Sequence, residues 1–225
     1  MIDPNPEPDS LTPVHAGDED AMSAYDGIGW TTADDHQIDI IIDHDSWPAK
    51  AGDQVKSGFC RMFDAALAAH DMKSCAVSLL LCSDDKIRQL NFDHRGKDKA
   101  TNVLSFPAAD EDQAGDKIGD HAGDQTGDQN REQLGDIAIA YETCVREADE
   151  SGISTHNHVT HLFLHGVLHL LGYDHENDDD ANEMEMLEIK LLAAIGIANP
   201  YGDLGGDNAI DDAAKNEIAM TEPAS

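Results

Sequence analysis

Hydrophobic positions follow two different spacings along the chain, and each spacing predicts a different kind of element. Short apolar runs with the length and bulk of buried strands occur at 38–42, 76–82, 102–106 and 135–140. Elsewhere, apolar residues recur every three or four positions, which predicts amphipathic helices. These helical segments are 53–70, a segment after Ser83, 142–151, a segment after Ser154, and one from about Asp180 to Gly196.

The order of the elements is strand, helix, strand, helix, strand, strand, and then helices. It predicts an α+β domain in which a small mixed four-stranded sheet is packed with about five helices. Ser83 and Ser154 stand where helix N-caps are expected. The third and fourth strands are separated only by a low-complexity insert, so we expect them to pair as an enlarged hairpin.

Three segments lack any hydrophobic period and are rich in acidic residues. Residues 1–35 and 202–225 contain Pro, Asp and Gly without periodicity and are predicted to be disordered acidic tails. The insert at 108–133 repeats Gly-Asp every four residues, which is typical of a flexible acidic loop. A single domain is therefore expected at 36–201, with the insert inside it.

The net charge of −32 is distributed unevenly. Residues 1–35 hold nine acidic residues and neither Lys nor Arg, whereas residues 36–107 hold ten acids against nine bases. A large negative charge argues against a nucleic-acid substrate. Here that argument is weaker, because much of the negative charge lies in the predicted tails and insert.

The chain lacks the features of a membrane or secreted protein. It contains no apolar stretch long enough for a membrane span and no basic, apolar leader at its start. Its four cysteines are scattered and form no C-x-x-C pair. They are typical of a reduced cytoplasmic protein, and we expect no membrane partner.

The segment after Ser154 carries histidines at metal-ligand spacing. His165 and His169 stand four residues apart, so they project from one helix face, one turn apart. Gly172 can take the left-handed conformation that ends a helix, which would turn His175 back toward the same face. Three neutral imidazoles with one open position form the ligand set of a catalytic zinc site. We predict one Zn²⁺ per chain on these histidines, although nickel, copper and iron also accept three imidazoles.

The residues around these histidines leave several roles open. The spacing matches the zinc-peptidase pattern H-E-x-x-H-x-x-G-x-x-H, except that Gly166 replaces the glutamate base. Glu176 is a possible replacement base. His161, one turn before His165, could be a further ligand, a residue that orients a ligand, or a helix residue without such a role. Asp174 could orient an imidazole or fix the turn through its backbone.

A cluster of cations forms a second candidate site. Arg95, Lys97 and Lys99 lie within five residues, just before the 102–106 strand, in a chain with only 14 Lys and Arg. Such a charge run is commonly a solvated face. Its position beside an apolar strand instead favours an anion-binding lip, because Arg and Lys are the natural partners of phosphate.

Both candidate sites together resemble the YbeY family of bacterial metal-dependent endoribonucleases. The similarity rests on Arg95–Pro107, on Leu134–Ile137 and on His165–His175, and it spans roughly residues 36–201 without the insert. The string H-G-x-L-H-L-x-G-Y-D-H is highly specific, and the glycine at its second position is the family's own. The resemblance implies a zincin-like α+β fold, zinc on the three histidines, and a functional role for Arg95.

The resemblance also implies an activity. It points to cleavage of single-stranded RNA, chiefly in 3′ maturation of small-subunit ribosomal RNA and in ribosome quality control, with ribosomal RNA and the ribosome or its small subunit as partners. The leading hypothesis is metal-assisted phosphodiester hydrolysis, with Arg95 holding the scissile phosphate and Lys97 and Lys99 holding its neighbours. A rival is a non-catalytic ribosome-assembly factor whose zinc fixes the helix and turn. A metallopeptidase or small-molecule hydrolase is a third reading, and Gly166 weakens it.

Overall fold

The structure is a computed structural model that describes residues 28–47, 53–108, 131–175 and 177–202. Most of the predicted tails and insert lies outside these ranges. Within them, the chain forms an α+β fold with five strands and five helices. None of the described helices is long and apolar enough to cross a membrane.

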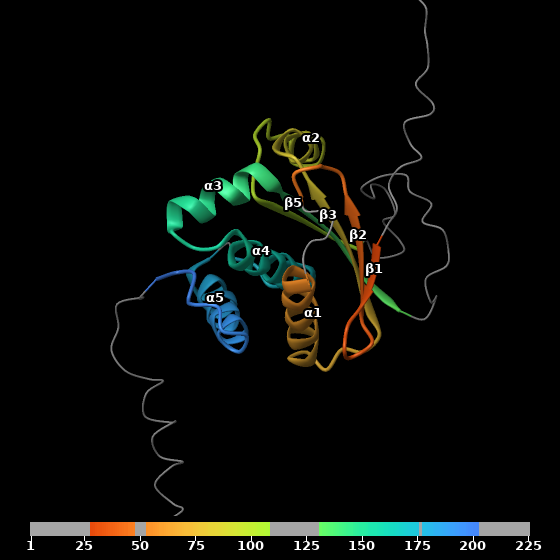
Figure 1. Ribbon diagram of the computed structural model, residues 1–225. Coiled ribbons are helices and arrows are strands. Elements are labelled where there is room, and N and C mark those ends of the chain that lie inside the picture. The colour runs from red at the N-terminus through yellow and green to blue at the C-terminus, as the bar shows by residue number, and fades with distance from the viewer. Residues whose placement is uncertain (1–27, 48–52, 109–130, 176, 203–225) are drawn as a thin grey trace, which may run out of the picture.

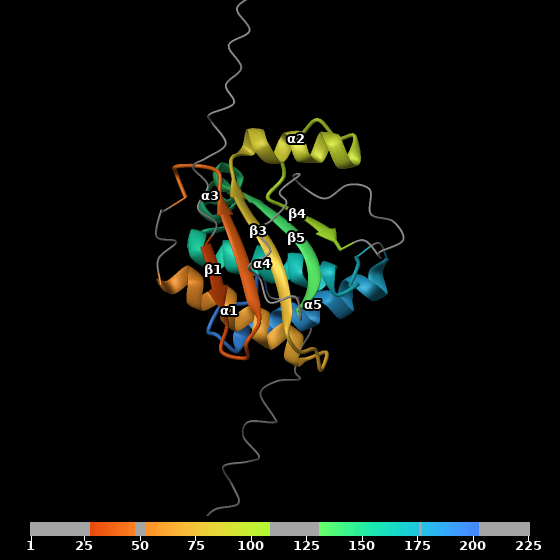
Figure 2. The same cartoon turned by 90° about the vertical axis from the view of Figure 1, so that its right-hand side faces the viewer.

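The sheet is mixed, with the strand order β1-β2-β3-β5-β4. At one edge, β1 (Ile28–Thr31) pairs antiparallel with β2 (Gln37–Ile42). The central strand β3 (Cys75–Cys82) runs parallel to both β2 and β5 (Glu132–Ala140). At the other edge, β4 (Val103–Pro107) pairs antiparallel with β5, as Figure 2 shows, which confirms the predicted hairpin.

Four helices lie on one side of the sheet (Figure 1). They are α1 (Asp53–Ala68), α3 (Tyr141–Ser151), α4 (Thr155–Leu170) and α5 (Asp178–Ala193). Side chains from α1, α4 and α5 join alternate residues of β2, β3 and β5 in the main core. This core includes stacked rings of Phe59 and Phe163, with centroids 4.5 Å apart, which pack α1 against α4. The packing fixes the position of α4, the helix with the candidate ligands.

Helix α2 (Asp84–Arg95) packs on the opposite face of the sheet. Its Ile87 and Leu90 join Cys82, Leu104 and neighbouring alanines in a second, smaller cluster. Successive residues of a strand point to opposite faces of the sheet. The strand residues of this cluster therefore alternate with those that point into the main core. The predicted caps are confirmed: the hydroxyl of Ser83 accepts from the Lys86 N–H at 3.2 Å, and that of Ser154 from the Asn157 N–H at 3.1 Å.

The prediction of four strands was wrong, because β1 lies inside the segment predicted as a disordered tail. Residues 28–35 form this strand and the turn that leads to β2, so the fold begins before residue 36. Trp30 is buried in the main core, and Arg131 pairs with Asp35 at 2.9 Å to hold the turn. A four-residue strand with one buried side chain gives almost no periodic signal. The rest of that tail lies outside the described residues.

The predicted insert was also slightly too long at its end. β5 begins at Glu132, so the last two residues of the 108–133 segment belong to the strand rather than to a loop. The Glu132 N–H donates to the carbonyl oxygen of Ser74, which extends the pairing with the chain before β3. Residues 109–130, with the Gly-Asp repeats, lie outside the described residues, as do residues 203–225 of the second predicted tail.

At Gly135 the backbone of the chain paired with β5 comes so close that a side chain would collide with it. Gly135 has φ +138°, and a Cβ there would collide with the carbonyl oxygen of Phe106 and lie 2.8 Å from the Ala108 nitrogen. Both obstacles are backbone atoms of the paired chain. We predict that Gly135→Ala lowers the free energy of unfolding by about 3 kcal/mol, measured by urea denaturation.

Gly152→Ala is the matched control. Gly152 also has positive φ, +66°, but a Cβ there would meet no atom within 4 Å. The control should cost only about 1 kcal/mol, the ordinary penalty for a left-handed alanine. Equal losses in the two variants would contradict the role assigned to the close approach of β4.

Candidate metal centre

Helix α4 and the turn after it bring the three predicted ligands together. His165 and His169 lie one turn apart on α4, and Gly172, with φ +92°, reverses the chain toward His175. One ligand atom from each of the three rings lies within 4.8 Å of the others. The predicted left-handed turn and the predicted convergence are therefore both observed.

Hydrogen bonds fix which ring nitrogen each of the first two histidines presents. The Nδ1–H of His169 donates to the Tyr173 carbonyl oxygen at 2.9 Å, and a carbonyl can only accept. The Nδ1–H of His165 donates to Oε1 of Glu188 at 2.9 Å. In the neutral form of each ring the lone pair is consequently on Nε2, and the Nε2 atoms of the two rings face one another.

The two Nε2 atoms are 3.0 Å apart. Two lone pairs at this separation repel one another, so the arrangement calls for a cation between them or a proton on one. A tetrahedral ion about 2.0–2.1 Å from each nitrogen would place its ligands about 3.3 Å apart, close to the spacing observed. The donor set thus fits a zinc-like ion held by His165, His169 and His175.

The electrostatics of His169 favour the neutral form that can bind a metal. Burial lowers the pKa of its imidazole, and the nearby rings of His165 and His175 lower it further. The hydrogen bond to the Tyr173 carbonyl and the charge of Asp174 oppose this shift only partly. The ring is therefore held ready as a ligand.

Glu188 is the residue that organises the cluster, and it is fully buried. Its two oxygens accept hydrogen bonds from His165 and, at 3.0 Å, from Nε2 of His161, while the Tyr201 hydroxyl donates to the second oxygen. Burial alone would raise the pKa of this carboxyl, but the hydrogen bonds from His161, His165 and Tyr201 outweigh it and lower the pKa to about 2. The carboxylate is ionised and orients the ligand.

This arrangement answers the question left open for His161. Its ring bonds Oε2 of Glu188, whereas His165 bonds Oε1, and His161 is not one of the three side chains that converge. The sequence reasoning missed Glu188 itself. A signal for it exists, because Glu188 stands between Met184 and Leu192, one turn from each, on the buried face of α5. A lone acid in an apolar stripe is rarely left without a buried partner.

Gly166, which replaces the glutamate base of the zinc peptidases, is closely packed. A Cβ at this position would lie 3.0 Å and 3.1 Å from two carbons of Ile137 and 3.1 Å from the hydroxyl of Ser105. Helix α4 therefore rests directly on β4 and β5 at the residue beside His165. Any side chain larger than glycine would force Ile137 and Ser105 to move, so this tight packing disfavours a glutamate at position 166.

The turn that carries His175 is tied down from two sides. The Tyr173 hydroxyl lies 3.0 Å from Nε2 of His70, which anchors the turn to the end of α1. Asp174 accepts the backbone N–H of His175 at 2.7 Å. Of the two roles left open for Asp174, the structure shows the backbone one. Glu176, the possible replacement base, lies outside the described residues.

The three predicted phosphate-binding cations lie at the end of α2 and in the loop after it. Arg95, Lys97 and Lys99 are all exposed. None of them makes a side-chain hydrogen bond or ion pair with another residue in the described part of the chain. The structure records no contact between them and the imidazoles.

Strand β4 lies between the two candidate sites. Its Ser105 faces Gly166 of α4, while the adjacent Phe106 contacts His94 of α2, with ring centroids 4.8 Å apart. In Figure 2 the C-terminal end of α2, β4 and the C-terminal part of α4 lie on the same side of the molecule. Strand β4 therefore contacts both helices, α4 through Ser105 and α2 through Phe106.

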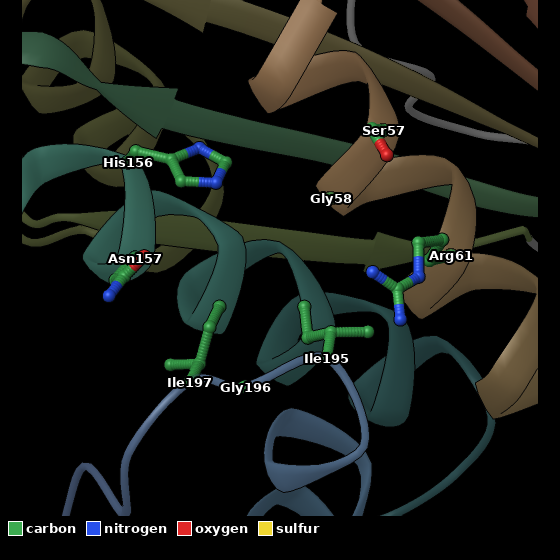
Figure 3. Close-up of a pocket in the computed structure, with 8 residues that line it drawn as sticks. All are labelled: Ser57, Gly58, Arg61, His156, Asn157, Ile195, Gly196 and Ile197. Atoms are coloured by element: carbon green, nitrogen blue, oxygen red, sulfur yellow. The ribbon is translucent and has the colours of Figure 1, made fainter.

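A separate pocket of about 370 Å³ lies at the other end of α4 (Figure 3). Arg61 of α1 and His156 of α4 face it from opposite sides, above Ile195 and Ile197. His156 precedes His165 by nine residues, about 14 Å along the helix. Arg61 donates to the carbonyl oxygen of Ala194 at 3.4 Å, which ties α1 to the end of α5. This pocket is not part of the histidine site.

The comparisons with known proteins agree with this description. A family model described as endoribonuclease YbeY matches residues 41–196. Three proteins named endoribonuclease YbeY are similar to the chain. That of Erythrobacter litoralis is 45% identical over 174 residues, covering 74% of this chain and 98% of its own. That of Sphingopyxis alaskensis is 46% identical over 157 residues (70% and 89%), and that of Dinoroseobacter shibae 51% over 144 residues (63% and 78%).

The fold and the site define a class: a small α+β domain with three imidazoles gathered at the end of one helix, in an arrangement that fits a single metal ion. Within that class, the chain belongs to the endoribonuclease YbeY family. The resemblance read from the sequence is thereby confirmed.

We predict that Glu188→Gln weakens zinc binding by about 10–100-fold, because the amide cannot accept from both imidazoles as an anion does. The measurement is competition for zinc against a chromophoric chelator. Glu147→Gln is the control, since Glu147 also accepts from a histidine of α4, His158, at 2.9 Å, but away from the cluster. Equal zinc affinities for Glu188→Gln and the unaltered chain would show that Glu188 does not orient a ligand.

Proposed function

We propose that this protein is a zinc-dependent endoribonuclease that cleaves single-stranded RNA, and that it acts in 3′ maturation of small-subunit ribosomal RNA and in ribosome quality control. Family membership supports the nuclease activity. The metal dependence is supported by the convergence of three imidazoles, two of which have their Nδ1 atoms engaged by Glu188 and by the Tyr173 carbonyl. Ribosomal RNA within the small subunit is the proposed substrate.

His165, His169 and His175 would hold the ion. When bound, it would act as a Lewis acid on a phosphoryl oxygen and make a coordinated water more acidic. The chain's own contribution is to orient the rings. Glu188 and the Tyr173 carbonyl do this by holding the Nδ1 protons of His165 and His169.

Arg95 would bind the phosphate and stabilise the charge that develops on it during cleavage. Its guanidinium has no partner among the described residues, so it is available to an anion. Lys97 and Lys99 would contact the flanking phosphates. Glu188 cannot serve as the general base, because it is fully buried and its oxygens already accept three hydrogen bonds.

We place this activity in the cytoplasm. The four cysteines are free, and burial raises the pKa of the Cys82 thiol to about 12 and raises that of Cys144 as well. Such thiols are inert core residues that need no disulfide. A peptidase function is disfavoured because Gly166 stands at the position of the glutamate base of that class and is closely packed against Ile137 and Ser105.

The first prediction of this proposal concerns His165. The purified chain should cleave single-stranded RNA, and His165→Ala should abolish cleavage because two imidazoles cannot complete the ligand set. The measurement is single-turnover cleavage of an end-labelled single-stranded RNA with stoichiometric zinc.

His158→Ala is the matched control, since His158 is on the same helix and pairs with Glu147 rather than joining the cluster. It should retain cleavage. A His165→Ala protein that folds and still cleaves at the rate of the unaltered chain would refute metal-dependent catalysis and leave a non-catalytic role for the ion.

The second prediction concerns the cations. A variant with Arg95, Lys97 and Lys99 all changed to Gln should bind single-stranded RNA more weakly, with a smaller dependence on salt. Loss of three phosphate contacts should reduce the slope of log affinity against log salt by about two. Fluorescence anisotropy across a salt series measures this.

Lys73→Gln combined with Lys190→Gln is the control, because both are exposed lysines outside the α2–β4 loop. This control should change the slope less. An unchanged slope in the triple variant would show that these cations do not contact phosphate.

A further inference from the structure

Phe92 is an aromatic side chain left in solvent. It lies on α2 and is 56% exposed. The other large hydrophobic side chains exposed in the described part of the chain are aliphatic: Ile28, Ile153 and Met186. A single exposed apolar residue is common on protein surfaces. What distinguishes Phe92 is the set of charges beside it.

Phe92 shares one strip of α2 with two arginines. Arg88 precedes it by four residues and Arg95 follows it by three, so all three side chains are neighbours on the helix surface. The buried face of the same helix is formed by Ile87, Leu90 and Asn91. The exposed strip therefore presents an aromatic ring beside the guanidinium that the proposed function assigns to phosphate.

The loop after α2 is held rigidly alongside this strip. Arg88 forms a two-pronged ion pair with Asp98, with contacts of 2.6 Å and 3.0 Å. Asn91 donates through its side chain to the Lys99 carbonyl at 2.7 Å, and its own carbonyl accepts the Lys97 N–H at 3.2 Å. The loop backbone is thus fixed without use of the Lys97 and Lys99 ammonium groups.

The charge of this region is unusual for the chain. The protein has 46 acidic residues and only 14 Lys and Arg. Arg88 neutralises Asp98, the acid within the loop, while Arg95, Lys97 and Lys99 keep their charge unpaired within the described residues. An unpaired cationic loop beside an exposed aromatic ring is the combination that binds single-stranded nucleic acid, in which bases stack on the ring and phosphates meet the cations.

We propose that Phe92 is a stacking platform for a base of single-stranded RNA, next to the phosphate held by Arg95. A duplex cannot use it, because the faces of paired bases are covered by their neighbours in the stack. Phe92 therefore contributes to the preference for single strands rather than to cleavage itself. This proposal rests on the proposed function for its substrate class, but its test measures binding and not cleavage.

The experiment compares binding of a fluorescein-labelled oligouridylate with binding of a base-free ribose-phosphate strand of the same length. Affinities are measured by anisotropy in the full-length chain with His165→Ala, which keeps the RNA intact. Phe92→Ala should weaken oligouridylate binding about tenfold or more and leave the base-free strand unaffected. Phe92→Tyr should retain most of the affinity, because its ring still stacks.

Ile153→Ala is the matched control, since Ile153 is 40% exposed in the loop before α4. It should bind both strands as the parent does. A Phe92→Ala protein that binds oligouridylate as tightly as its parent would overturn the proposal. Equal weakening on both strands would also overturn it, since Phe92 would then act on the fold of the loop. Loss of binding to isolated small subunits, with RNA affinity unchanged, would assign Phe92 to a protein contact instead.

A second measurement does not depend on the His165→Ala background. Phe92→Trp in the otherwise unaltered chain places an exposed indole in a protein whose own Trp30 and Trp47 are buried. Stopped-flow mixing with oligouridylate should quench its emission within the binding phase, and the base-free strand should not. Absence of quenching on RNA binding would contradict stacking, whether or not the RNA is later cleaved.

Discussion

The candidate site depends on one buried charge, the Glu188 carboxylate. Taking an ionised carboxylate out of water is costly unless it is paired and hydrogen-bonded. Here three donors from two segments, His161 and His165 on α4 and Tyr201 after α5, satisfy it. These bonds fix the position of α5 against α4, orient His165, and keep its Nε2 lone pair directed at the cluster. The interaction that joins the helices is also the one that prepares the ligand.

A second constraint acts from the opposite side of α4. The helix lies so close to β4 and β5 at Gly166 that even a Cβ would press against the side chains of Ile137 and Ser105. This contact sets the height of His165 above the sheet and places the β4 edge beside the histidines. It also separates this fold from peptidases of similar spacing, which need the volume for a glutamate. The missing base and the close packing are one feature of the structure.

The histidine cluster was predictable because its geometry is local. Residues four apart on a helix share a face, and a glycine after the helix allows the chain to return, so His165, His169 and His175 were found from spacing alone. The pairing of β4 with β5 was predictable for a similar reason, since the two strands follow one another. Glu188 was missed because its role arises from contacts between distant segments, and β1 because a four-residue strand with one buried side chain gives almost no periodic signal. Trp30 is buried by the main core, and Glu188 acquires its partners only when α5 packs on α4.

We infer that the protein presents three imidazoles, and only three, to one metal ion. X-ray absorption spectroscopy at the zinc edge, on the full-length chain loaded with zinc, counts them directly. We expect one zinc per chain, with three imidazoles at about 2.0–2.1 Å and one further light ligand. A fourth imidazole would contradict it by making His161 a ligand. Zinc bound by two imidazoles, or in no fixed stoichiometry, would contradict the site itself.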